Sequence, residues 1–160
     1  MSNGIILTCR INSNRFPLKA LRKINDKEFI VHVIDRLKKF KLEIVLATTN
    51  NKEDEILCDL AKANNIHYFK GSEDDVIKRI YDASNKLKFK NIIHTTGDNV
   101  FIDVLSSKSM FKYHLENQND FTEMSGLPWG AFTYALKVSS ISNILKFKDK
   151  IDSELWHDYF

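Results

Sequence analysis

The sequence predicts an α/β fold with a mostly parallel sheet flanked by helices. Short runs of apolar and β-branched residues alternate along the chain with stretches whose apolar residues recur every three to four positions. That alternation is typical of parallel strands joined by helical crossovers. The chain has 160 residues, of which 43% are hydrophobic and 28% are charged, so it is long enough to bury a core. We expect a single domain over residues 1–160.

The first half of the chain carries the clearest elements. Residues 4–9 (GIILTC) predict a buried strand. Residues 28–39 predict an amphipathic helix, because their apolar side chains recur at positions i, i+3, i+4 and i+7. The other elements expected here are strands at 43–48 and 66–69 and a helix at 53–63 with a buried face of Ile56, Leu57, Leu60 and Ala61.

A second set of elements follows residue 70. Ser72 and the acids after it predict the start of a helix, because a serine oxygen accepts a backbone N–H and negative charge favours the N-terminal end of a helix. Residues 91–95 predict a strand that leads into Thr96, Gly97 and Asp98. The remaining elements expected are a helix at 103–114, strands at 121–124 and 132–138, and a helix at 140–147.

The last six residues, LWHDYF, form an aromatic-rich end. Trp156, Tyr159 and Phe160 would need cover from other apolar groups if they were exposed. We therefore expect a domain that is cut short at its C-terminus.

Charge and motif content argue against several classes of protein. The 24 basic and 21 acidic residues give a net charge of +3, a balance that predicts no nucleic-acid partner. The sequence has no run of 18 apolar residues, so we expect no membrane span. Cys9 and Cys58 form no disulfide framework and no paired metal-ligand spacing, which favours a reducing, cytoplasmic location. Glycine-rich dinucleotide loops, Walker-type loops and HExxH zinc motifs are all missing from the sequence.

Two unusual polar segments follow the first and fourth predicted strands. Ligands of open parallel sheets bind outside the C-terminal ends of the strands, so both segments are candidates for one site. Residues 96–98 offer a single carboxylate, Asp98, at a tight turn. The other segment, residues 10–19, offers the cations Arg10, Arg15 and Lys19 and the small polar residues Asn12, Ser13 and Asn14.

Cations that face a lone carboxylate suggest a polyphosphate bound with Mg²⁺, which takes one or two carboxylates together with phosphate oxygens. Small polar residues also let backbone amides approach an anion. Each segment has a plainer interpretation, since a basic loop is often solvated surface and Asp98 could form a turn or cap a helix. Their coincidence at one edge of a sheet favours the ligand site.

Four ordered motifs resemble a known family. Residues 5–21, IILTCRINSNRFPLKAL, resemble the opening signature of cytidylyltransferases, I-I-x-A-R-x-x-S-x-R-x-P-x-K-x-L. The segments EIVLATTNNKED, FKGSEDDVIKRIYDA and HTTGDNVFID resemble the spore-coat polysaccharide and acylneuraminate branch, whose members are CMP-sugar synthetases. The resemblance covers residues 4–104 well and the last third faintly. The residues in register with the opening signature are Arg10, Ser13, Arg15, Pro17, Lys19 and Leu21.

The resemblance implies a nucleotide-diphospho-sugar transferase fold, which is Rossmann-like, and a nucleotidyl transfer from CTP. A sugar oxygen would attack the α-phosphorus and pyrophosphate would leave. Arg10, Arg15 and Lys19 would hold the triphosphate as catalytic residues, and Asp98 would hold Mg²⁺. The other nucleotide-binding residues implied are Leu7, Thr8, Asn12, Ser13, Thr96 and Gly97, with Gly71, Ser72 and Arg79 on the side of the base.

The acceptor implied by the resemblance is a sugar, expected to be acidic and destined for surface polysaccharide, and the enzyme is expected to be a homodimer. The sequence departs from the family where a late strand usually supplies a second acid within Gly-Leu-Asp-Val-Glu. The counterpart here is residues 130–134, GAFTY, with Phe132 at the acid's place. Glu123, Asp152 and Glu154 are the candidates to replace it.

Two other functions remain open at this point. The first is a catalytically impaired nucleotide- or sugar-binding domain with a regulatory or assembly role, which Phe132 and the abrupt end of the chain favour. The second is a sugar-1-phosphate nucleotidyltransferase that uses another base, because position and spacing alone predict only a triphosphate with a metal.

Overall fold

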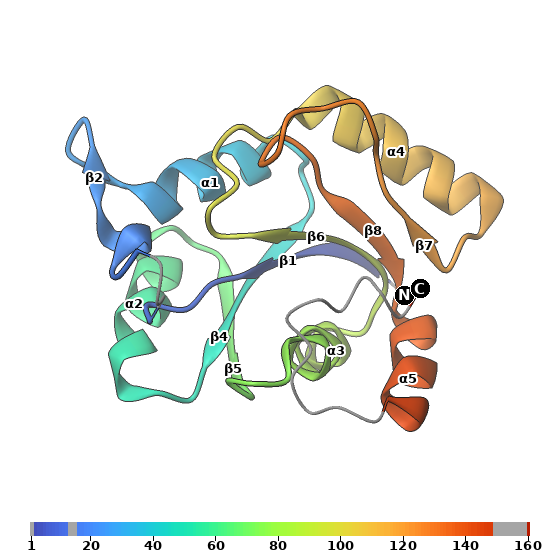
Figure 1. The fold of residues 1–160 in the computed structure, drawn as a ribbon, viewed down its shortest axis with the longest axis horizontal. Coiled ribbons are helices and arrows are strands. Elements are labelled where there is room, and N and C mark those ends of the chain that lie inside the picture. The colour runs from blue at the N-terminus through green and yellow to red at the C-terminus, as the bar shows by residue number, and fades with distance from the viewer. Residues whose placement is uncertain (1, 13–15, 149–159) are drawn as a thin grey trace.

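The computed structural model describes residues 2–12, 16–148 and 160. It contains a six-stranded sheet in which four neighbouring strands run parallel. The strands, in order across the sheet, are β5 (His67–Gly71), β4 (Glu43–Thr49), β1 (Ser2–Thr8), β6 (Phe89–Thr96), β8 (Tyr134–Lys137) and β7 (Phe121–Thr122). The strand β8 runs antiparallel to both of its neighbours (Figure 1). The predicted α/β class with a mostly parallel sheet is confirmed.

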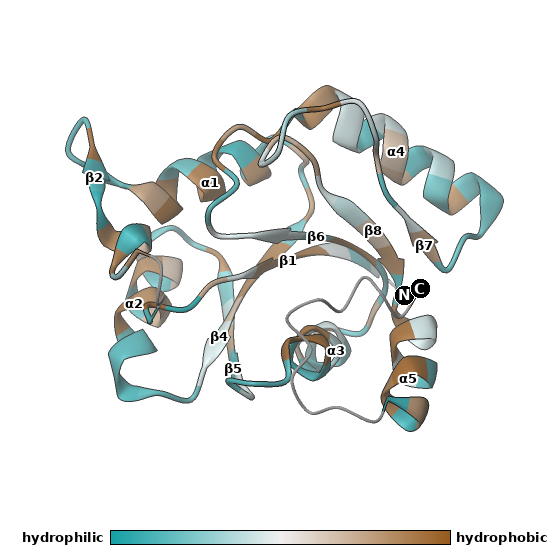
Figure 2. Ribbon diagram, viewed as in Figure 1, coloured by the Kyte–Doolittle hydropathy of each residue, from teal (hydrophilic) through white to brown (hydrophobic). Residues whose placement is uncertain are grey.

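Helices cover both faces of this sheet (Figure 1). The helices are α1 (Phe29–Lys38), α2 (Glu55–Ala63), α3 (Val76–Lys86), α4 (Val104–Asn117) and α5 (Val138–Phe147), with short 3-10 turns η1 (Lys19–Leu21) and η2 (Lys52–Asp54). One apolar cluster joins the sheet to α1, α2 and α4, and a second joins the opposite face to α3 and α5. Figure 2 shows hydrophobic residues along β1 and on α5. The core therefore consists of two layers, one on each side of the central strands.

Most predicted elements are confirmed within a few residues, but some details were wrong. Ile56 was expected on the buried face of its helix, whereas it is exposed and Cys58 is buried in its place. The helix expected to start at Ser72 begins at Val76, with the Asp75 carboxylate accepting the backbone N–H of Lys78. Ser72 still accepts a backbone N–H, that of Asp75, over 3.1 Å.

The region after residue 117 also differs in extent from the prediction. The strand expected at 121–124 covers Phe121–Thr122 alone, and the strand expected at 132–138 is β8. Trp156 and Tyr159 lie outside the described residues, as do Asp152 and Glu154. Phe160 packs against Phe121, with their ring centroids 5.1 Å apart.

A short hairpin between the first loop and α1 was missed. It consists of β2 (Lys23–Ile24) and β3 (Lys27–Glu28), and Asn25 and Asp26 form its turn, both with positive φ. Asparagine and aspartate are the non-glycine residues that adopt this conformation most readily, so the Asn-Asp pair was the available signal.

One titratable group in the core links pH to the stability of the fold. His94 is 1% exposed and hydrogen-bonds through Nε2 to Thr8 Oγ1 over 3.0 Å, which ties β6 to β1. Burial, and to a lesser degree the charge of Arg79, lowers the pKa of His94 from 6.5 to about 3. The imidazole is therefore neutral in the folded protein near pH 7.

We expect His94 to make the fold acid-sensitive. Its pKa is lower in the folded than in the unfolded chain, so its stabilising effect is complete above about pH 6.5 and declines as pH falls toward 3. At about 1.4 kcal/mol per pKa unit, the free energy of unfolding should fall by several kcal/mol across that window. Urea titrations at pH 7 and pH 4.5 measure this. A His94→Gln variant should lose less stability between the two pH values than the unsubstituted protein, and equal losses would refute the role of His94.

Among the described residues, no helix has both the length and the apolar content needed to cross a bilayer.

Candidate functional site

The loops after β1 and β6 are joined at the C-terminal edge of the parallel strands. Thr8 and Thr96 are register partners, and Gly97 donates its backbone N–H to the Thr8 carbonyl over 2.8 Å. A Cβ on residue 97 would lie 2.7 Å from Cys9 Sγ and 2.9 Å from Ile30 Cδ1. Only glycine therefore lets the two loops approach this closely.

Cys9, which lies beneath this contact, is a thiol at neutral pH. Burial raises its pKa to about 12, and the negative charges of Asp54 and Asp98 add to the effect. This environment suits a packing residue and not a reactive thiol.

Lys19 and Asp98 meet above these loops. Lys19 begins η1, at the end of the first loop, and its Nζ lies 2.5 Å from Asp98 Oδ2. Thr96 Oγ1 donates to the other carboxylate oxygen of Asp98 over 2.5 Å. Both side chains remain partly exposed, at 29% for Lys19 and 41% for Asp98. The pair therefore faces solvent, where a ligand can reach both charges.

The Asp98 carboxylate is ionised at neutral pH. Partial burial alone would raise its pKa, but the hydrogen bonds from Lys19 and Thr96 and the charge of Lys19 outweigh burial and lower the pKa. Two opposite charges are thus present at the edge of the sheet, and each suits one part of a metal-bound phosphate.

Asp54 anchors the start of the first loop to the neighbouring strand. Its side chain is 2% exposed and accepts the backbone N–H of Ile11 over 2.7 Å and that of Thr49 over 3.2 Å, together with the Thr49 hydroxyl. Cys9 adds a backbone bond from its N–H to the Ala47 carbonyl over 3.2 Å. These bonds fix the backbone on both sides of Arg10.

Sequence reasoning missed this role of Asp54. The available signal was an acid shortly after a β-branched strand, inside the segment TTNNKED that supported the resemblance.

Arg79 supports the loop on the other side of the site. It is 3% exposed, and its guanidinium donates to the carbonyls of Ser72 over 2.5 Å and Glu73 over 3.3 Å. Burial and the charge of nearby Arg10 lower the pKa of Arg79, although an arginine remains charged throughout the physiological range. A Cβ at Gly71 would lie 3.1 Å from Arg79 Cγ. Arg79 therefore supports this loop from below and, with Arg10, concentrates positive charge there.

The structure does not bring all of the predicted site residues together. Leu7 is fully buried in the core, so its side chain is not available to a nucleotide. Asn12 is exposed, whereas Ser13 and Arg15 lie outside the described residues. The predicted residues that the structure places at this edge of the sheet are Thr8, Arg10, Lys19, Gly71, Ser72, Arg79, Thr96, Gly97 and Asp98. Their roles toward a ligand stay predictions.

The surroundings of Phe132, where the family pattern has a second acid, are aromatic. The Phe132 ring packs between Trp129 and Tyr134, with both centroid distances 5.6 Å. Glu123 follows β7 and is exposed. Over residues 2–12, 16–148 and 160, no three His, Cys, Asp or Glu side chains are grouped to hold a metal ion. Asp98, a partly exposed carboxylate, would fit a Mg²⁺ ion that arrives bound to phosphate, because such an ion needs only one or two carboxylates.

The fold and the site together define a class of protein. A largely parallel α/β sheet with cations, one carboxylate and a glycine-tight loop contact at the C-terminal edge of its strands is a nucleotide-binding architecture. The comparison with known sequences identifies the family. A sequence profile of the cytidylyltransferases matches residues 4–153, and the chain belongs to that family.

Two curated relatives are named for polysaccharide biosynthesis and for cytidylyl transfer to a sugar acid. The chain is 28% identical over 131 residues to the spore coat polysaccharide biosynthesis protein SpsF of Bacillus subtilis. The aligned region covers 78% of this chain and 55% of that protein. It is 29% identical over 136 residues to the 3-deoxy-manno-octulosonate cytidylyltransferase of Wigglesworthia glossinidia brevipalpis, covering 67% of this chain and 55% of that enzyme. The chain thus spans about half the length of these curated relatives.

A solved structure confirms the fold over almost the whole chain. A cytidylyltransferase from Leptospira borgpetersenii superposes with a TM-score of 0.91 at 25% identity, covering 99% of this chain and 71% of that one. The predicted Rossmann-like nucleotidyltransferase fold is therefore confirmed.

Proposed function

We propose that this chain carries the nucleotide site of a sugar cytidylyltransferase, which transfers CMP from CTP to a sugar and releases pyrophosphate. The observation that carries the proposal is the solvent-facing Lys19–Asp98 pair at the C-terminal edge of the sheet. A cation and an ionised carboxylate 2.5 Å apart suit a triphosphate and the divalent ion bound to it. Membership of the cytidylyltransferase family supports CTP as the nucleotide.

The chain's own residues act mainly through charge and position. A hydroxyl oxygen of the sugar forms a bond to the α-phosphorus and gives its proton to solvent, while the bond from the α-phosphorus to the oxygen that bridges the α- and β-phosphates breaks. Negative charge then accumulates on the leaving pyrophosphate. Lys19 and Arg10 provide the compensating positive charge, which is the main contribution a protein makes to such transfers. The bonds from Asp54 hold the backbone around Arg10 in place while this happens.

Mg²⁺ is part of the proposal. Asp98 would hold it, and the bound ion would supply Lewis-acid polarisation of the phosphate oxygens. In the structure Asp98 is paired with Lys19. Phosphate oxygens would replace the Asp98 carboxylate as the partner of Lys19, and Asp98 would then be free to hold the cation.

The finer parts of the function also rest on the relatives. We propose an acidic sugar acceptor and a role in surface-polysaccharide synthesis, supported by the names of the two curated relatives. We propose a homodimer, as the family resemblance implies. The location proposed is the cytoplasm, where the free thiols of Cys9 and Cys58 remain reduced.

A second candidate function is a binding domain that has lost catalysis. The position of Phe132, where the family pattern has an acid, favours it. This candidate predicts that CTP binds with the same affinity with and without Mg²⁺ and that no sugar is turned over.

Pyrophosphate release tests the proposal. The protein is incubated with CTP, Mg²⁺ and single acceptors, among them 3-deoxy-manno-octulosonate and N-acetylneuraminate, and pyrophosphate is measured with a coupled assay. Release that requires both the sugar and CTP supports the cytidylyltransferase. No release with any acceptor, combined with metal-independent CTP binding, supports the binding domain instead.

A further inference from the structure

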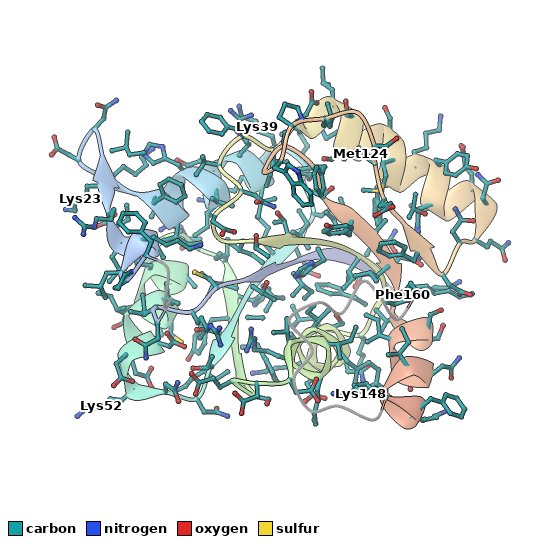
Figure 3. All side chains as sticks on the ribbon, viewed as in Figure 1. Lys23, Lys39, Lys52, Met124, Lys148 and Phe160 are labelled. Carbon is teal, nitrogen blue, oxygen red and sulfur yellow. The ribbon has the colours of Figure 1, made fainter. Side chains whose placement is uncertain are left out.

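A row of aromatic rings crosses the antiparallel end of the sheet. Trp129 and Phe132 have centroids 5.6 Å apart, as do Phe132 and Tyr134. The row continues to Phe121, 5.8 Å from Tyr134, and ends at Phe160, labelled in Figure 3. At its other end, Trp129 is 90% exposed. The most exposed large ring in the described part of the chain is thus the end of a row of contacting rings, tilted at Trp129–Phe132 and edge-to-face at Phe132–Tyr134.

The strand register places this exposed end beside the nucleotide site. Tyr134 pairs with His94, and β8 runs antiparallel to β6, so the chain that leads into Tyr134 comes from the C-terminal end of β6. Asp98 follows β6 on the same edge. Trp129 and Phe132 are therefore at the C-terminal edge of the parallel strands, where ligands of such sheets bind.

Two contacts fasten the segment that carries these rings to the Asp98 loop. Asp103 donates its backbone N–H to the Ala131 carbonyl over 2.7 Å. Gly130, at φ +85°, lies beside the same loop, where a Cβ would be at an ordinary contact distance of 3.7 Å from Asn99 Oδ1. Asn99 in turn donates from its side chain to Thr95 Oγ1 over 3.1 Å. The position of Trp129 is thus coupled to the loop that holds Asp98.

Trp129 lies on the opposite side of the site from the loop supported by Arg79. Gly71 ends β5 and Trp129 precedes β8, and these strands are four steps apart in the sheet. At about 4.8 Å per step the two ends are separated by roughly 19 Å. A nucleotide whose base lies near Gly71 and whose phosphates lie near Lys19 leaves the Trp129 side for the second substrate.

We propose that Trp129, backed by Phe132, forms the wall of the acceptor subsite and binds the apolar C–H face of a pyranose ring. The inference rests on the proposed function, because it takes the nucleotide to occupy the Gly71 side. The face of an indole carries partial negative charge and attracts the slightly positive C–H groups of a sugar ring. Phe132 stands where the family pattern has an acid, and in this proposal it supports the apolar surface that binds the acceptor.

The fluorescence of Trp129 measures this binding without turnover. The Trp156→Phe variant leaves Trp129 as the single tryptophan. The probes are 3-deoxy-manno-octulosonate, N-acetylneuraminate and methyl β-D-galactopyranoside, each added to protein that already holds CTP in the absence of Mg²⁺, the ion that the proposed transfer requires. Mannitol, a polyol without a ring face, is the negative control. We expect at least one pyranose to shift the emission to shorter wavelength, and mannitol and CTP alone to leave it unchanged.

Three results would overturn the inference. If no pyranose shifts the emission, Trp129 is not at the acceptor subsite. If CTP alone shifts it, the ring stacks on the base. If the emission changes with protein concentration and sedimentation shows a larger species, the ring contacts a second copy of the chain.

Substitution separates this inference from the proposed function. Trp129→Ala should weaken binding of the responding pyranose about tenfold, measured by saturation-transfer NMR, while the dissociation constant for CTP stays the same. Trp129→Phe should retain most of the affinity. Phe147→Ala, which removes a ring that is 80% exposed at the end of α5, should change neither. Sugar binding at Trp129 without pyrophosphate release would refute the proposed function alone, whereas turnover unaffected by Trp129→Ala would refute the inference alone.

Discussion

Lys19→Ala is expected to lower kcat for pyrophosphate release by about 10²- to 10³-fold, the usual cost of removing one donor that stabilises charge in the transition state. Lys19 is the cation that the structure places directly on the Asp98 carboxylate, with Nζ 2.5 Å from Asp98 Oδ2. Its loss leaves the charge that accumulates on pyrophosphate without its nearest compensation. Steady-state kinetics of pyrophosphate release measure the effect.

The fold should survive this substitution. A partly exposed ion pair contributes only about 0–1 kcal/mol to stability, so the thermal midpoint should move by little. Lys23→Ala is a matched control, because Lys23 is a more exposed lysine of the β2–β3 hairpin that pairs with Glu28 at 3.6 Å. If Lys19→Ala retained full activity, or if Lys23→Ala lost as much, the role assigned to Lys19 would be wrong.

Asp54→Ala is expected to destabilise the fold by about 3 kcal/mol and to weaken CTP binding as well. Each hydrogen bond to a charged group contributes about 1.5–3 kcal/mol to stability. Removal of a buried carboxylate also leaves its buried donors without an acceptor. The donors affected are the backbone N–H groups of Ile11 and Thr49. Release of Ile11 also frees the backbone next to Arg10, one of the cations proposed to hold the triphosphate.

Urea unfolding and CTP titration measure the two effects separately. Glu53→Ala is the neighbouring control, since Glu53 is an exposed acid of η2 and its loss should change neither quantity. Stability close to that of the unsubstituted protein for Asp54→Ala would show that the Asp54 bonds do not hold the loop.

The sequence predicted which side chains meet at the edge of the sheet better than it predicted the buried residues that hold the neighbouring loops in place. Parallel strands end at a common edge, so the loops that follow the first and fourth predicted strands had to come together whatever the details of packing. The Lys19–Asp98 contact, across 79 positions of chain, is therefore within reach of sequence reasoning. The roles of Asp54 and Arg79 are not, because a buried charge is recognised by its partners, and those partners are backbone groups.

Other errors have similar physical causes. Ile56 was assigned to a buried face because helical spacing fixes which residues share a face but not how far that face extends. The end of the sheet was unclear because β8 pairs antiparallel with β6 and β7, and such pairing leaves no mark on local periodicity. The placement of Trp129 beside the Asp98 loop follows from that register and from the Asp103–Ala131 backbone hydrogen bond.

Calorimetric titration of CTP into the protein, with and without Mg²⁺ and repeated with UTP, ATP and GTP, tests the central claim most directly. The account predicts that CTP binds more tightly than the other nucleotides and that Mg²⁺ strengthens the binding. It also predicts that the gain from Mg²⁺ disappears in Asp98→Asn, because the cation would lose its single protein carboxylate. CTP binding that is indifferent to Mg²⁺, or no binding of any nucleotide, would contradict the assignment of the Lys19–Asp98 edge as a metal-triphosphate site.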